Sequence, residues 1–214
     1  TKDGGDQFDG SFHVYTGDYI TSDKIFPGLN NFQISDDFSI SGSISGPILP
    51  GRLTFYSSAR VNQSKGWLNG LQTFTIYGDT VFHDKNGNKY FDSGDEKKEP
   101  YHASLNSFDS WSLQNKITFR PLPSTVLKLN SIINARSGQS YIHVLQMLEN
   151  AQLNNTNQGN LINLSLSHSF SSRTFFQLNL SEYTYGYQSK LFDDPLDERY
   201  ITPDSLFWAN VQGT

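Results

Sequence analysis

The sequence predicts an all-β protein built as an antiparallel, up-and-down meander. Three observations predict this class: apolar and polar residues alternate with a period of two in seven segments, tight turns containing Pro, Gly or Ser join some of them, and Ser, Asn and Gly are abundant. The 214 residues are 14% aromatic with a formal net charge of -5, which is typical of a folding chain. Cysteine is absent, which excludes disulfides and thiolate metal sites.

The first three expected strands each have one apolar and one polar side. Residues 8–15 alternate Phe, Gly and Val with Asp, Ser, His and Tyr. Residues 32–44 alternate Phe and Ile with Asp and Ser, and residues 52–61 alternate Leu, Phe, Ala and Val with Thr, Tyr, Ser and Arg. Because successive side chains of a strand point to opposite faces, this pattern predicts a sheet whose two faces meet different surroundings.

The last four expected strands repeat the pattern. Residues 111–120 set Trp, Leu, Ile and Phe against Ser, Gln, Lys, Thr and Arg, and residues 126–135 set Leu, Ile and Ala against Lys and Asn. Residues 162–170 set Ile, Leu and Phe against Asn and Ser, and residues 176–187 begin in the same way and end in alternating tyrosines. The segment from Tyr141 to Ala151, with apolar residues at three-residue intervals, predicts either a short helix or an irregular loop.

Short and long connections alternate along the chain. Residues 45–51, 121–124 and 171–173 are tight turns, whereas the other connections are long and the longest spans residues 62–108. This alternation puts all short turns at one end of the sheet and all long loops at the other. It is the layout of a large transmembrane β-barrel of the bacterial outer membrane, with short periplasmic turns and long extracellular loops.

The polar side of these segments would then face the barrel lumen and the apolar side the lipid. Lumen-facing cations expected from the pattern are Arg60, Lys116, Arg120 and Lys128. A soluble β-sandwich or a lipocalin-like barrel also has alternating strands, so the pattern alone leaves both architectures open.

Three stretches resemble TonB-dependent receptors, especially those of the Bacteroidetes and Chlorobi type. Residues 1–11, TKDGGDQFDGS, resemble the exit of the plug domain into the first barrel strand. Residues 38–48, with LTFY at 53–56, resemble the second strand, first periplasmic turn and third strand of that family. Residues 164–176, LSLSHSFSSRTFF, are similar to a later strand, turn and strand unit.

The resemblance implies a piece of a longer protein of a Gram-negative bacterium. Residues 1–7 would be the end of the plug domain, and residues 8–214 the first seven or so strands of a barrel of 22. It implies energised uptake of a scarce or bulky solute, such as a metal chelate, a vitamin or an oligosaccharide. The implied partners are outer-membrane lipid, the protein's own plug, a TonB-type energising protein outside this chain, and a surface lipoprotein.

Two alternatives to transport stay open. The first is an outer-membrane barrel that acts as a scaffold or secretion-associated component with partner proteins. The second is a soluble glycan-binding β-sandwich. An enzyme is not expected, because GxSxG, P-loop and GxGxxG motifs are absent and the five histidines are scattered. Nucleic acid is not an expected partner, because the pI is about 5.4.

The long loop contains a segment with the spacing of a calcium loop, residues 84–96. Oxygen ligands at positions 1, 3, 5, 7, 9 and 12 of such a loop surround Ca²⁺, and the candidates here are Asp84, Asn86, Asn88, the carbonyl of Tyr90, Asp92 and Asp95. The segment resembles dockerin and thrombospondin-type loops. Lys89 stands where Gly makes the turn and Asp95 where Glu is usual, so the expected affinity is weak. The alternative is a solvated Asn-Gly turn.

Overall fold

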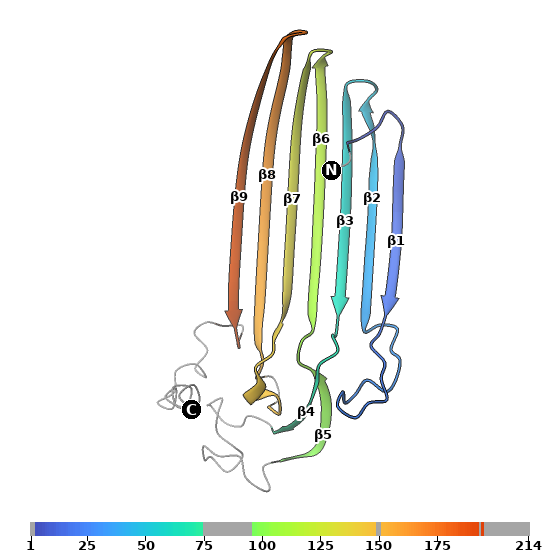
Figure 1. The fold of residues 1–214 in the computed structure, drawn as a ribbon, viewed down its shortest axis with the longest axis vertical. Helices are drawn as coiled ribbons and strands as arrows, with labels where there is room; N and C mark the ends of the chain where they lie inside the picture. The colour runs from blue at the N-terminus through green and yellow to red at the C-terminus, as the bar shows by residue number, and fades with distance from the viewer. Residues whose placement is uncertain (1–2, 75–95, 149–150, 193, 195–214) are drawn as a thin grey trace.

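The computed structural model describes residues 3–74, 96–148, 151–192 and 194, and it is all-β (Figure 1). The strands are β1 (Asp9–Gly17), β2 (Asp37–Leu49), β3 (Leu53–Ser64), β4 (Asn69–Phe74), β5 (Glu96–Ser104), β6 (Phe108–Leu122), β7 (Thr125–Ser140), β8 (Leu153–Ser171) and β9 (Thr174–Lys190). Helical structure in these ranges is one 3-10 turn, η1 (His143–Leu145). None of the described helical structure is long and apolar enough to cross a membrane.

Seven of the strands form one antiparallel sheet in the order β1-β2-β3-β6-β7-β8-β9. Each strand pairs with the next strand of this series, so the expected meander is confirmed. Within the described residues, β1 and β9 are the two edges of this open sheet. Strands β4 and β5 form a separate two-stranded sheet at the end where the long loops lie (Figure 1).

The three hairpin turns lie together at the opposite end of the sheet (Figure 1). The first turn joins β2 to β3 through Pro50 and Gly51. Gly51 has a φ of 70°, which glycine adopts without the steric cost of a side chain. The grouping of short turns at one end and long connections at the other therefore agrees with the alternation of loop lengths in the sequence.

The turn ends are staggered from hairpin to hairpin. Leu53, Leu127 and Leu178 lie in one row of paired residues. In the first hairpin the last pair before the turn contains Leu53 itself. In the second hairpin the last pair contains Thr125, two residues nearer the turn than Leu127, and in the third it contains Thr174, four residues nearer the turn than Leu178. The shift is one residue per strand. With about 3.3 Å per residue and about 4.8 Å between strands, a line through the turns makes an angle of about 35° with the perpendicular to the strands.

Two local expectations need correction. The second strand begins at Asp37 instead of residue 32, because a turn precedes it in which the Asp36 N–H donates to the Gln33 carbonyl. Strand β8 begins at Leu153 instead of residue 162 and stays paired with β7 throughout. The long loop 62–108 contains two strands, β4 and β5.

Of the two alternatives for the segment from Tyr141 to Ala151, a short helix and an irregular loop, the structure has the irregular loop. It contains the 3-10 turn η1, and residues 149–150 lie outside the description. Its apolar residues pack at the loop end of the sheet, where Leu145 and Leu148 form a small cluster with Ala151. The buried hydrophobic residues of the described chain all lie outside the strands; they are Leu29, Leu105, Leu145, Leu148 and Ala151.

Candidate functional site: the polar face of the sheet

The register of the seven strands sorts their side chains into an apolar face and a polar face, because directly paired residues share a face. The apolar face carries Phe12, Val14, Ile40, Ile44, Phe55, Val61, Trp111, Leu113, Ile117, Phe119, Leu127, Leu129, Ile133, Ile162, Leu164, Leu166, Phe176, Leu178 and Leu180. The polar face includes Ser11, His13, Ser41, Ser43, Ser58, Arg60, Ser112, Gln114, Lys116, Thr118, Lys128, Asn130, Asn134, Asn163, Ser165, Asn179 and Ser181.

Burial on the two faces is the reverse of that in a water-soluble sheet. On the polar face Thr54 is 0% exposed, Thr118 is 1% exposed and Lys116 is 8% exposed. On the apolar face of the same central strands, Ile117 is 41% exposed and Trp111 is 45% exposed, whereas the edge strands β1 and β9 are exposed on both faces. An exposed apolar surface of this extent marks a contact with another protein or with lipid.

A row of small polar residues interrupts the apolar face in the middle of the sheet, and the loop-side half of this face on β8 and β9 is polar as well. Ser57, Asn115 and Ser131 are paired across β3, β6 and β7. The Ser57 hydroxyl donates to Asn115 Oδ1 at 2.8 Å. This hydrogen bond pairs two of the polar side chains within the sheet, which lowers the free-energy cost of placing them among apolar neighbours.

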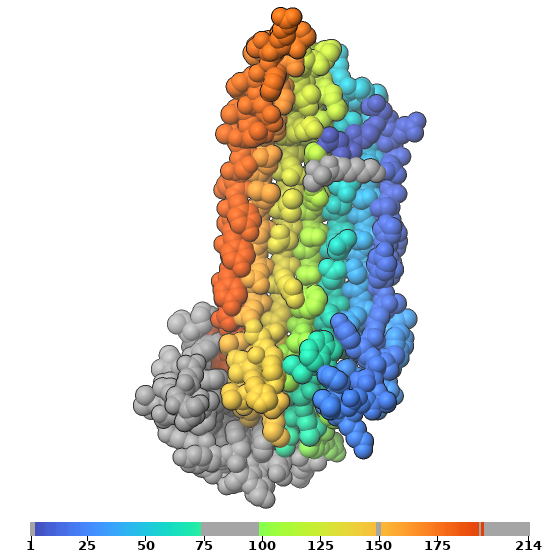
Figure 2. Space-filling model, viewed as in Figure 1, coloured from blue at the N-terminus to red at the C-terminus, as the bar shows by residue number. Residues whose placement is uncertain are grey.

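The segment that leads into β1 lies against the polar face. Asp3 forms ion pairs with Lys116 and Lys128, the latter at 3.0 Å between Oδ2 and Nζ. In Figure 2 the dark-blue N-terminal residues lie across the neighbouring strands of this face. Gly4 allows the close approach, because a Cβ at this position would collide with the backbone of Phe55.

The pKa of Asp3 lies below its ordinary value. Desolvation raises the pKa, but the hydrogen bonds and the positive charges of Lys116 and Lys128 lower it by more. Asp3 is therefore ionised over the physiological pH range and holds the entering segment on the polar face by charge.

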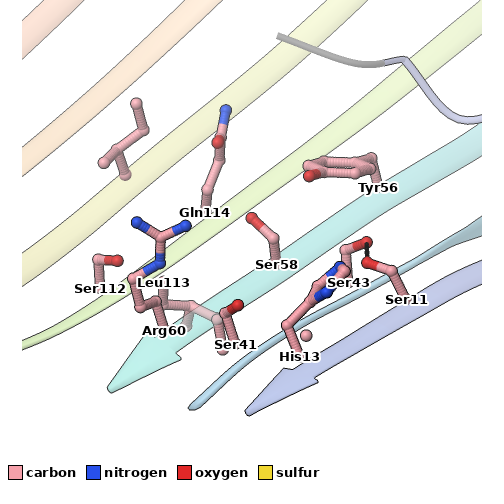
Figure 3. A pocket seen from close by; sticks show the side chains of 13 residues that line it. Ser11, His13, Ser41, Ser43, Tyr56, Ser58, Arg60, Ser112, Leu113 and Gln114 are labelled. Atoms are coloured by element: carbon pink, nitrogen blue, oxygen red, sulfur yellow. Dashed lines mark hydrogen bonds between the residues drawn. The ribbon is translucent and has the colours of Figure 1, made fainter. Parts of the chain in front are cut away.

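A groove of about 350 Å³ opens on the polar face between β1 and β6. Ser58 and Arg60 rise into it from β3, and Ser112 and Gln114 come from β6 (Figure 3). His13 lies at its β1 side. Hydroxyl, amide, guanidinium and imidazole groups together can donate to and accept from a polar solute.

Cross-strand hydrogen bonds fix the side chains around this groove. The Ser11 and Ser43 hydroxyls are 2.8 Å apart and joined by a hydrogen bond, marked in Figure 3. Nearer the loops, the Asn62 amide accepts from Ser39 at 2.7 Å and donates to Ser110 at 3.1 Å. The polar face is thus an ordered hydrogen-bonding surface that spans several strands.

Charge is unevenly distributed over the polar face. Arg60 on β3, Lys116 and Arg120 on β6, and Lys128 and Arg136 on β7 are cations. The polar-face positions of β8 and β9 carry no charged side chain in the described strands; they include Leu153, Asn155, Asn157, Gly159, Leu161, Asn163, Ser165, Ser167, Ser169, Phe175, Gln177, Asn179, Ser181, Tyr183, Tyr185, Tyr187 and Ser189.

The structure brings together the four cations expected from the sequence, Arg60, Lys116, Arg120 and Lys128, on one face of the sheet. The calcium-loop residues lie outside the described residues; they are Asp84, Asn86, Asn88, Tyr90, Asp92 and Asp95. Sequence reasoning missed the pairing of Asp3 with two lysines, because the residues are more than a hundred positions apart and share no local pattern.

Comparison of the chain with protein-family models, with curated proteins and with solved structures finds no match.

Proposed function

We propose that this chain is part of a bacterial outer-membrane β-barrel that takes up a scarce or bulky solute, in the manner of the TonB-dependent receptors it resembles. The observation that carries the proposal is the reversed burial of the two faces. Leucine, isoleucine and phenylalanine on the apolar face point outward, where lipid would solvate them, and serine, threonine and lysine on the polar face are covered.

The stagger of the turns supports the same proposal. Strands of outer-membrane barrels are tilted by about 35–45° from the barrel axis. If the turn ends of this sheet are laid in one plane at the membrane surface, the shift of one residue per strand tilts the strands by about 35°. A sheet of a soluble sandwich has no such plane to which its turns must conform.

The contact of Asp3 with Lys116 and Lys128 supports a lumen closed by the preceding segment. In the proposed barrel, residues 1–7 connect a plug to the first strand, and the polar face lines the path of the solute. The solute would be a metal chelate, a vitamin or an oligosaccharide, and a TonB-type protein would supply the energy. Ca²⁺ bound at residues 84–96 would stiffen an extracellular loop.

A scaffold or secretion-associated barrel is the second candidate, favoured by the loop between β1 and β2. This loop exposes large apolar side chains at the end of the sheet away from the turns; they are Tyr19, Ile20, Ile25, Phe32 and Ile34. Such a patch suits a surface lipoprotein or another protein partner.

The test begins with fractionation of cells that express the full-length protein. We expect a species in the detergent-extracted outer membrane whose electrophoretic mobility changes on heating, as a β-barrel unfolds. Deletion of the gene should abolish growth on the limiting solute, and an uncoupler should stop uptake in the parent strain. A soluble product contradicts the barrel, and an intact barrel whose deletion leaves every uptake rate unchanged favours the scaffold.

A further inference from the structure

The polar face of β9 presents three tyrosines on one side of the strand, in its loop-side half. Tyr183, Tyr185 and Tyr187 are 63%, 56% and 59% exposed. Side chains at alternate positions of a strand are about 6.7 Å apart, which is comparable to the length of one pyranose unit. The three rings therefore form a row along which successive sugar rings of a linear chain could lie.

Hydrogen bonds hold two of these rings across the neighbouring strand. The Tyr185 hydroxyl donates to Asn157 Oδ1 at 2.7 Å, and the Tyr187 hydroxyl donates to Asn155 Oδ1 at 3.1 Å. Each acceptor lies on β8, one pair further toward the loops than the residue directly opposite the tyrosine. The rings thus lean across the sheet and are fixed before any ligand arrives, which lowers the entropic cost of binding.

The floor beside the tyrosines has apolar groups and a gap. Leu161 on β8 is paired with Tyr183 and, on its other side, with Ile132 of β7. The next row toward the loops pairs Gly159 with Tyr185. Gly159 leaves room for the Asn134 side chain, which lies 3.0 Å from the place a Cβ would occupy. Amide donors and acceptors therefore stand next to a surface of carbon atoms.

We propose that this surface, Tyr183, Tyr185, Tyr187, Asn155, Asn157 and Leu161, binds a neutral oligosaccharide. A pyranose ring has an apolar side of C–H groups, which packs on an aromatic ring, and a rim of hydroxyls, which pair with amides. The proposal rests on the proposed function, because it names the solute whose path the polar face lines.

The lack of charged side chains on the polar face of β8 and β9 favours a neutral solute over an anionic one. In the described strands β8 and β9, the polar face offers no cation to a carboxylate, a phosphate or an anionic metal chelate. Its groups are amides, hydroxyls and aromatic rings, which recognise uncharged polyols. The nearest cation is Arg136 on β7, in the same row as Asn157 and Tyr187. Its guanidinium packs over the Phe108 ring of β6, 4.1 Å from the ring centroid, on the side of β7 away from the tyrosines.

The test is isothermal titration calorimetry of the full-length protein in detergent micelles. The probes are maltohexaose and cellohexaose, with hexagalacturonate as an anionic probe of similar length. We expect one of the neutral hexaoses to bind with a Kd at least about tenfold lower than that of hexagalacturonate. Tyr183→Ala and Tyr185→Ala should each raise the Kd about tenfold, because each removes one stacking ring.

Two variants keep the test specific. Tyr185→Phe keeps the ring and loses only the bond to Asn157, so its Kd should rise about twofold to threefold. Tyr15→Ala removes an equally exposed tyrosine from the polar face of β1, across the sheet, and should leave the Kd unchanged. Binding of neither hexaose, equal binding of hexagalacturonate, or an equal loss in Tyr15→Ala would overturn the proposal.

Cell fractionation separates this proposal from the proposed function. Failure of both hexaoses to bind a protein that is found in the outer membrane overturns the oligosaccharide site and leaves the barrel. Binding that Tyr185→Ala abolishes, in a protein that is absent from the outer membrane, supports the site and overturns the barrel.

Discussion

Lys116 and Ile117 are neighbours in β6, yet the lysine is 8% exposed and the isoleucine is 41% exposed. The same contrast recurs in β2 and β8, whereas the edge strands β1 and β9 are exposed on both faces. In β2, β6 and β8 burial follows the face on which a residue lies, and the more polar face is the more buried one. Water as the only solvent would favour the opposite arrangement by roughly 25 cal/mol per Å² of apolar surface. The difference between the faces is the arrangement expected if the apolar face contacts lipid, as the proposed barrel requires.

The largest effect should come from a charge placed on the apolar face. We expect Leu129→Arg or Leu166→Arg to reduce assembly in the outer membrane strongly, because an arginine facing lipid near the midplane costs about 2–4 kcal/mol. Ser165→Arg, one residue from Leu166 but on the polar face, is the matched control. Outer-membrane levels of the full-length protein measure the effect, and equal levels of the three variants would refute the assignment of the faces.

A smaller effect should follow from a side chain at Gly4. Gly4→Ala pushes a Cβ into the Phe55 backbone and should displace the entering segment, at a cost of about 1–3 kcal/mol. Gly186→Ala is the control, because nothing lies within 4 Å of its Cβ position. Urea unfolding midpoints of the refolded protein in lipid vesicles would measure both. Similar shifts for the two variants would argue against a tight contact of the segment with the polar face.

Removal of the Asp3 carboxylate tests the charge on the polar face. Asp3→Ala removes this partner of the largely buried Lys116 and should lower the free energy of unfolding by about 1 kcal/mol. The expected effect is smaller than for a fully buried ion pair, because Asp3 is more than a third exposed. Asp36→Ala breaks the surface pair with Lys65 and should cost less. Urea unfolding midpoints of the two variants measure the two losses of stability. A larger shift of the midpoint in Asp36→Ala than in Asp3→Ala would contradict the account.

The smallest effect concerns pH. Because the folded-state pKa of Asp3 is depressed, its stabilising contribution is complete above the ordinary pKa of 3.8 and is lost as pH falls through the lower folded-state value. A spin label at Gln7→Cys should gain mobility over that acid range in the native background. Adding Asp3→Asn should remove the pH-dependent step, and a step that persists in the double variant would assign it to another group.

Much of the fold was predictable from the sequence, because the alternation of apolar and polar residues is a local signal. The meander and the sorting of Arg60, Lys116 and Lys128 onto one face follow from it. The start of β8 was not predictable, because Asn154 to Asn160 is polar on both faces and therefore shows no alternation. Pairing with β7 extends the strand across this segment.

Contacts between segments far apart in the sequence were also not predictable. Strands β4 and β5 are separated by residues 75–95, and their pairing leaves no short-range pattern. The tyrosine series of β9 was visible as alternation, but its acceptors Asn155 and Asn157 lay before the expected start of the preceding strand. The site could be read only once the register between β8 and β9 was known.

Fluorescence quenching on β8 tests the central claim most directly. The chain contains no cysteine, so Leu164→Cys and Ser165→Cys can each carry a bimane label in the full-length protein reconstituted into vesicles. A nitroxide on the lipid acyl chains should quench the label at residue 164 strongly and the label at residue 165 weakly, because in the proposed barrel the first would face lipid and the second the lumen. Weak quenching at both residues, with the label at residue 164 also protected from a water-soluble quencher, would mean that protein covers the apolar face and would contradict the account.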